Sequence, residues 1–208
     1  MYETLEEFTH DALLCGDDFY KDILADPKKI ETAHHIYLLV RNGTPLGITI
    51  VGRGSFDGEV SNEDHPNIDQ YVKDNFKTLR ESSQDIGGVL DMTHWSLLAN
   101  DAWLLASLHS LTEFHLASPL HWTNMWDDKR ERITITAREV IGIASSGYVI
   151  TRPYPAMEPV AVCHNQRLAL TASLLTHKAH IASYQKKDKK STQAALKDFL
   201  ATLPADIQ

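Results

Sequence analysis

Two side chains suited to proton transfer lie close together near the middle of the chain, at Asp91 and His94. They fall in the apolar run from Val89 to Leu98, which predicts a buried strand. Histidine titrates near neutral pH and a carboxylate accepts a proton directly or through water, so each is a candidate general base. Their spacing places them on opposite faces of the strand. The alternative is that both side chains satisfy polar groups of neighbouring loops.

Cysteine chemistry is a further alternative. Cys163 directly precedes His164. Adjacent residues on a strand point to opposite faces, so these two side chains cannot easily act as a nucleophile and its base. Cys15 is an equally possible nucleophile, although both cysteines are of a type that is usually buried as an apolar residue. A cysteine-dependent hydrolase is therefore the third hypothesis for this chain.

The eleven histidines of the chain do not predict a metal site. His109 and His115 share a predicted helix, but their spacing of six does not bring them to one face, which needs three or four. His177 and His180 have the right spacing and lack an evident third ligand. We expect no metal cofactor.

Composition and charge exclude several classes of protein. The 208 residues are 43% hydrophobic, which suits one medium-sized domain with its own core. A net charge of -8 argues against a nucleic-acid partner, because no positive excess replaces the phosphate counterions. No apolar run is long enough to span a bilayer, and the acidic start MYETLEEFTHD is unlike a secretion signal. We expect a cytoplasmic protein without a membrane partner, and the sequence indicates no oligomeric state.

Strands and helices alternate around Asp91 and His94. This alternation predicts an α/β or α+β fold with a mixed central sheet flanked by helices. The fourth helix has two possible starts, because Thr136 and Glu139 match a capping box that would leave 133–135 as a strand. The predicted central elements are a strand at 89–98, a helix at 101–117, a strand at 121–126, a helix from 130 or 136 to 146, and a strand from Gly147.

The ends of the chain are predicted from helix caps and turn residues. The expected N-terminal elements are a helix at 2–15 stopped by Gly16, a short helix to Leu24, a hairpin of strands 35–40 and 46–51 around Asn42 and Gly43, and a helix at 69–81. The expected C-terminal elements are a strand at 159–163, one long helix at 166–185 capped by Asn165, a basic linker at 186–190, and a last helix capped by Ser191.

This order of elements resembles the GNAT superfamily of N-acyltransferases. The stretch Asn42-Gly43-Thr44-Pro45-Leu46-Gly47 looks like the family's hairpin turn, 90–98 like its central strand, and 103–117 like its cofactor helix. Residues 121–126 look like the fifth strand, and Gly147-Tyr148 like the closing glycine-aromatic step. The resemblance covers 2–163. It implies a GNAT-like domain over 1–164, with a helical extension at 165–208 packed on the same domain.

The resemblance implies transfer of an acyl group from acyl-CoA or an acyl carrier protein to an amine. The partners would be a small-molecule acyl donor and an amine acceptor, and Asp91 or His94 would be the catalytic base. The donor would lie along the central strand, with its phosphates at the start of the next helix. The residues implied for cofactor binding are Trp95, Leu97, Leu98, Asn100, Ala102 and Trp103.

Departures from the superfamily pattern support a second hypothesis, a GNAT-like module that binds a small molecule or a protein without catalysis. The stretch from Leu98 to Trp103 has no glycine or arginine, whereas the family admits the pyrophosphate through a turn rich in them. Ile143 stands where the family often has a tyrosine acid. The acyl-homoserine-lactone synthase branch is similar at 75–79, but it carries an arginine where this chain has Ile50.

Overall fold

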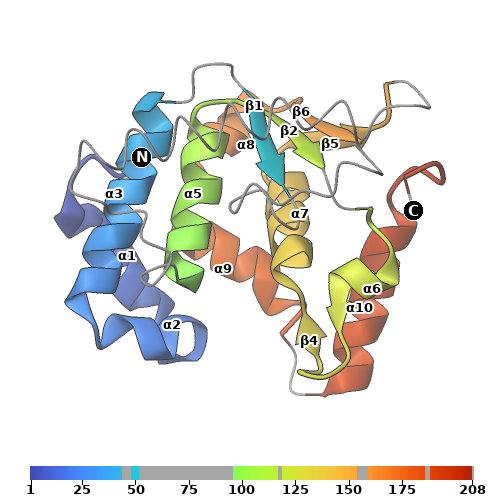
Figure 1. The fold of residues 1–208 in the computed structure, drawn as a ribbon, viewed down its shortest axis with the longest axis horizontal. Coiled ribbons are helices and arrows are strands. Elements are labelled where there is room, and N and C mark those ends of the chain that lie inside the picture. The colour runs from blue at the N-terminus through green and yellow to red at the C-terminus, as the bar shows by residue number, and fades with distance from the viewer. Residues whose placement is uncertain (44–47, 52–95, 117–118, 154–158, 186–187, 208) are drawn as a thin grey trace.

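Helices dominate the part of the chain that the computed structural model describes, which is residues 1–43, 48–51, 96–116, 119–153, 159–185 and 188–207. Within these residues the fold is a mixed α+β arrangement, mostly helical, with a small sheet (Figure 1). The helices are α1 (Leu5–Cys15), α2 (Asp17–Leu24), α3 (Pro27–Gly43), α5 (Leu97–His109), α6 (Trp122–Met125), α7 (Ile135–Ser145), α8 (Gln166–Leu170), α9 (Leu174–Ala182) and α10 (Lys189–Ala201).

The sheet contains strands in the order β1, β2, β6, β5. Strand β1 runs parallel to β2. Strand β6 lies between β2 and β5 and is antiparallel to both. A separate two-stranded ladder joins β3 to β4, with Trp126 opposite Ile133. The strands are β1 (Ile48–Val51), β2 (Glu113–Leu116), β3 (Trp126–Asp127), β4 (Arg132–Ile133), β5 (Tyr148–Thr151) and β6 (Val160–Cys163).

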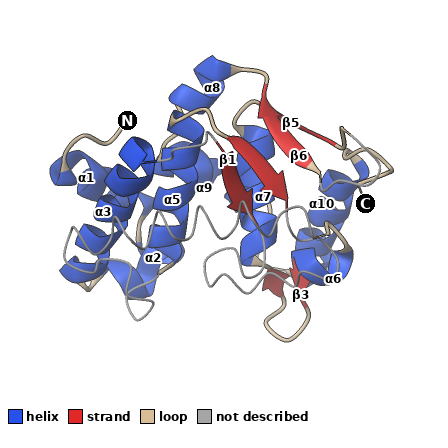
Figure 2. Ribbon diagram, turned by 45° about the horizontal axis from the view of Figure 1, so that its top comes forward, coloured by secondary structure: helices blue, strands red, loops and turns tan. Residues whose placement is uncertain are grey.

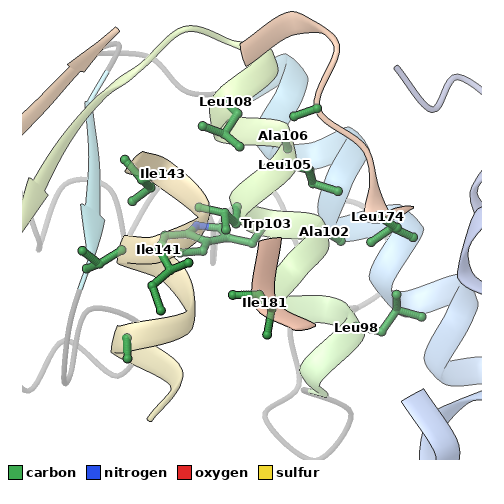
Figure 3. Packing of buried hydrophobic residues seen from close by; sticks show 14 of the residues in the cluster. Leu98, Ala102, Trp103, Leu105, Ala106, Leu108, Ile141, Ile143, Leu174 and Ile181 are labelled. Atoms are coloured by element: carbon green, nitrogen blue, oxygen red, sulfur yellow. The ribbon is translucent and has the colours of Figure 1, made fainter. Parts of the chain in front are cut away.

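Helix α5 is the centre of the described core. Its sequence is apolar on nearly all sides, and nearly all of its residues are buried, as expected of a helix surrounded by other elements. Ser96 caps its start by accepting a hydrogen bond from the Ala99 N–H at 3.1 Å. Figure 3 shows the Trp103 indole extending from α5 toward Ile141 of α7. Figures 1 and 2 show α1, α2 and α3 on the side of α5 away from the sheet.

The predicted hairpin strand at 35–40 is wrong, because these residues belong to α3. Pro27 begins this helix, where its missing N–H costs no hydrogen bond. The buried residues then recur every three or four positions at Ile30, Ala33, Tyr37 and Val40. That period is helical, and it outweighs the β-branched and aromatic content of 35–40. Strand β1 pairs with β2 instead, in parallel.

The predicted helix at 101–117 is shifted and shortened. Helix α5 starts earlier and includes Leu97 and Leu98, which were expected to end a strand. Leu111 has a φ of 55°, outside the helical range, and the chain then enters β2. The expected strand at 121–126 is also wrong over most of its length, since 122–125 form the single turn α6.

Helix α7 begins at Ile135, between the two predicted starts. Thr134 is its N-cap and accepts a hydrogen bond from the Ala137 N–H at 3.1 Å. The strand expected from Gly147 is confirmed as β5, and the strand expected at 159–163 is confirmed as β6. The expected helix from Arg130 fails because Asp127 accepts the backbone N–H groups of Lys129 and Arg130 in a turn.

The C-terminal helices differ from the single long helix that the sequence predicts at 166–185. Asn165 caps α8 as expected, but α8 ends after one turn and Ser173 caps the separate helix α9. Asp188, rather than Ser191, caps α10. The helices expected at the N-terminus are confirmed as α1 and α2. The expected helix at 69–81 lies outside the described residues.

Candidate functional site

A buried carboxylate, Asp101, joins four helices in the middle of the molecule. It lies on α5 and has no exposed surface. Its Oδ2 accepts a hydrogen bond from the Tyr20 hydroxyl of α2 at 2.5 Å. Arg138 of α7 donates Nε to Oδ1 at 2.8 Å and Nη2 to Oδ2 at 2.5 Å. His177 of α9 lies with Nε2 at 3.2 Å from Oδ1, and it must donate because an ionised carboxylate only accepts.

The charges of this cluster compensate one another. Burial on its own would raise the pKa of Asp101, but Arg138 and His177 outweigh it and hold that pKa well below its usual range. Burial would likewise lower the pKa of Arg138, and Asp101 raises it. The ring of Phe19 covers the guanidinium, with its centroid 4.1 Å from Cζ. The pair is therefore ionised, and the cluster fixes the side chain of Arg138 in one position.

A second buried carboxyl, Glu139, lies beside this cluster. Burial raises its pKa to about 8, and the neighbouring side-chain amide of Asn100 offsets part of that rise. The nearby charge of Asp101 raises the pKa further, whereas Arg138 lowers it. A carboxyl with such a pKa is protonated at neutral pH. Shifts of this size are concentrated at functional sites, although structural ion networks also produce them.

A pocket of about 460 Å³ lies at the start of α7. The β3–β4 hairpin, helices α7 and α10, and the segment after α9 form its walls. Arg138 belongs to both the pocket wall and the buried cluster, so the ion network holds one wall of the pocket. The lining residues are Leu97, Asp127, Arg130, Glu131, Arg132, Ile133, Thr134, Ile135, Arg138, Tyr184, Gln185 and Thr192.

Most of the charged groups around this pocket are paired. Arg138 pairs with Asp101, Arg130 lies 3.5 Å from Asp127, and Lys189 of α10 lies 2.8 Å from Glu131. Arg132 is exposed on β4 and has no partner for its guanidinium among the described residues. The pocket therefore carries one uncompensated cation in this part of the chain.

The structure places the sequence-predicted residues in different surroundings. Asp91, His94 and Trp95 lie outside the described residues, so their roles stay predictions. Leu97 lines the α7 pocket. The remaining four predicted cofactor residues are buried within α5, where neighbouring helices cover them, and their assignment also stays a prediction. These four are Leu98, Asn100, Ala102 and Trp103.

The cysteines do not form a nucleophile–base pair within the described residues. Cys15 is fully buried, and burial raises the pKa of its thiol to about 11, which suppresses the reactive thiolate. Cys163 lies opposite Tyr148 in the sheet, while its neighbour His164 is exposed. The described residues also contain no cluster of three or more potential metal ligands. In the same residues, no helix has the length and apolar character to cross a membrane.

Sequence reasoning missed Tyr20, Arg138 and His177 as members of one site. The only local signal was the adjacent charged pair Arg138 and Glu139 inside the apolar sequence of α7. Such a pair in a buried helix requires partners, but nothing in the sequence indicates which residues supply them.

No protein-family model, curated protein or solved structure matches this chain.

Proposed function

We propose that this protein binds a small organic molecule in the α7 pocket. The observation that supports this proposal is the pocket itself, with its mixed apolar and polar lining and its wall at Arg138 held by Asp101. Its volume of about 460 Å³ is within the range of small-molecule sites. A wall held in place before binding reduces the ordering cost of association. This function corresponds to a binding module rather than to an enzyme.

Acyl transfer by a GNAT-like fold is the second candidate function. Two observations support it. Leu97, one of the residues implied for cofactor binding, lines the pocket. Glu139 has a pKa of about 8 and lies beside Asn100, another such residue, and a carboxyl with this pKa is well matched to proton transfer near neutral pH. In this candidate the acyl chain would occupy the pocket, with acyl-CoA or an acyl carrier protein as donor.

The test of binding is a pocket-filling substitution. Ile135 is 48% exposed and lines the pocket, so Ile135→Trp should fill it without disturbing the core. Leu168 is equally exposed on α8 and does not line the pocket, so Leu168→Trp is the matched control. Saturation-transfer NMR with a mixture of six-carbon acids, alcohols and amines should show binding to the wild type and to the control. Equal signals from the Ile135→Trp variant would show that the probes bind elsewhere.

A thermal-shift titration separates the two candidates. A ligand that binds only the folded state raises the melting temperature by mass action. A saturable rise with hexanoyl-CoA that exceeds the rise with free hexanoate supports the acyltransferase candidate. A rise with hexanoate but with neither hexanoyl-CoA nor free CoA supports the binding module.

A further inference from the structure

We propose that the ligand of the α7 pocket is a small organic carboxylate, and that Arg132 binds its carboxylate group. This inference rests on the proposed binding function and names the chemical class of the ligand. Two observations support it, the charge pairing around the pocket and the position of Arg132 on the β3–β4 ladder.

Arg132 is the one charged lining residue without an ion-pair partner in the described part of the chain. The other two arginines of the lining are paired, Arg130 with Asp127 and Arg138 with the buried Asp101. The remaining carboxylate of the lining, Glu131, pairs with Lys189 of α10.

Asp127, the acidic residue opposite Arg132 in the ladder, is occupied by its own turn. Its Oδ1 accepts the N–H groups of Lys129 and Arg130 at 3.0 and 3.1 Å. Its Oδ2 faces Arg130 at 3.5 Å. The ladder pairing of Asp127 with Arg132 therefore fixes the backbone of Arg132, while its guanidinium has no bond to that carboxylate.

A single unpaired guanidinium favours a monoanion over a phosphate dianion. A dianion would leave one negative charge uncompensated, in a lining that already contains Asp127 and Glu131. A guanidinium also matches a carboxylate through two parallel hydrogen bonds. The ligand should therefore carry one carboxylate.

The rest of the pocket lining suits an apolar body. Leu97, Ile133, Ile135 and the ring of Tyr184 provide apolar surface beside the charged rim. Binding an aliphatic or aromatic group there removes that surface from water, which favours association in proportion to the area buried. A short carboxylic acid with about four to eight carbons combines both features.

The experiment measures dissociation constants by NMR titration for hexanoate, hexanol and hexyl phosphate. Hexanoate should bind at least several-fold more tightly than hexanol or hexyl phosphate, and its affinity should fall as salt is added. In the variant Arg132→Gln the affinity for hexanoate should fall roughly tenfold, as expected for loss of a charge-assisted hydrogen bond, while hexanol is unaffected. Arg132→Lys keeps the charge and should recover part of the affinity.

Arg130→Gln is the matched control, because it removes the same charge from the same hairpin but from a cation that is already paired. A smaller loss in this variant than in Arg132→Gln supports the specific role of Arg132. Equal binding of hexanoate and hexanol, or tighter binding of hexyl phosphate, would overturn the carboxylate inference while leaving the binding function intact. Absence of binding by all three probes would count against both.

Discussion

The guanidinium of Arg138 forms two parallel hydrogen bonds with the carboxylate of Asp101, and both side chains are almost completely buried. Such a pair seldom adds much net stability, because desolvation offsets most of the attraction between the charges. Losing one partner is far more costly, because the other charge is then buried alone. Tyr20 and His177 complete the hydrogen bonds of Asp101, so four helices depend on one carboxylate.

We expect Asp101→Asn to destabilise the protein by about 3–5 kcal/mol, because it leaves the Arg138 guanidinium buried without its counterion. Urea unfolding followed by circular dichroism measures this change. Arg138→Met removes the cation, so the double variant should be less destabilised than the sum of the two single variants. Additive losses would show that the two side chains are not energetically coupled.

Glu139→Gln should change how stability depends on pH. The pKa of Glu139 is about 8 in the folded protein against a reference of 4.5, so between these values the folded state holds a proton that the unfolded state has lost. The contribution of Glu139 to the free energy of unfolding is therefore fully present below about pH 4.5. It falls as pH rises to about 8, by up to about 1.4 kcal/mol per pH unit. The variant, which cannot ionise, should gain stability relative to wild type over this range.

The comparison between wild type and Glu139→Gln also removes the contributions of other groups. Asp101, whose pKa is lowered, contributes stability that is lost only at acidic pH, which is the opposite direction. Melting temperatures of both proteins at several pH values between 5 and 9 provide the measurement. A difference that stays constant over this range would mean that Glu139 is not protonated in the folded state.

Gly142→Ala should destabilise the protein by about 1–3 kcal/mol, although alanine usually favours a helix over glycine. A Cβ added at Gly142 would lie 2.8 Å from Cε1 of His177 and 2.9 Å from Cδ2 of Leu104. The helix α7 therefore approaches α5 and α9 too closely for a methyl group. Combining this change with Leu104→Ala should recover only part of the loss, because the contact with the imidazole remains. A variant as stable as wild type in urea would contradict this packing.

His109 should stay neutral well below the usual pH of histidine titration. Burial lowers its pKa to about 4, while a hydrogen bond to the Ala172 carbonyl offsets part of that effect. Its Nε2 lies 2.8 Å from that carbonyl and its Nδ1 lies 2.7 Å from the Tyr37 hydroxyl, so Nε2 carries the proton. Nitrogen NMR shifts should show this tautomer down to about pH 5.

Removal of the Tyr37 hydroxyl tests the same contact. Tyr37→Phe leaves Nδ1 of His109 and the Tyr2 N–H without their buried partner, which should cost about 1–3 kcal/mol. The unchanged ring keeps the packing with Tyr2 and His34. A loss smaller than about 0.5 kcal/mol, or a His109 tautomer with the proton on Nδ1 in wild type, would contradict the arrangement.

Elements with purely local signals could be predicted from the sequence. Gly16 has a φ of 72°, which only glycine adopts without strain, and it ends α1 as predicted. The side chain of Asn165 caps α8, and the run after Gly147 forms β5. The end of α1 and the cap of α8 each depend on residues within about four positions, so a short window of sequence contains the cause, whereas β5 also needs β6 as its hydrogen-bonded neighbour.

Tertiary structure decided the elements where two local signals compete. Residues 35–40 have the composition of a strand, but α3 buries their helical face against α5. Packing energy exceeds the small differences in intrinsic propensity, so the neighbour decides the conformation. The break between α8 and α9 also coincides with tertiary hydrogen bonds. The Ala172 carbonyl bonds with His109, and the Leu174 N–H donates to the Tyr2 hydroxyl.

Only the tertiary structure assembled the candidate site. Tyr20, Arg138 and His177 are 81, 37 and 76 residues from Asp101 in the chain, yet all three contact its carboxylate. The sequence shows that a charged pair occurs inside the apolar helix α7, and hence that buried partners are required. Which residues supply them depends on how α2, α5, α7 and α9 pack, because a carboxylate accepts hydrogen bonds from any donor that the fold brings within reach.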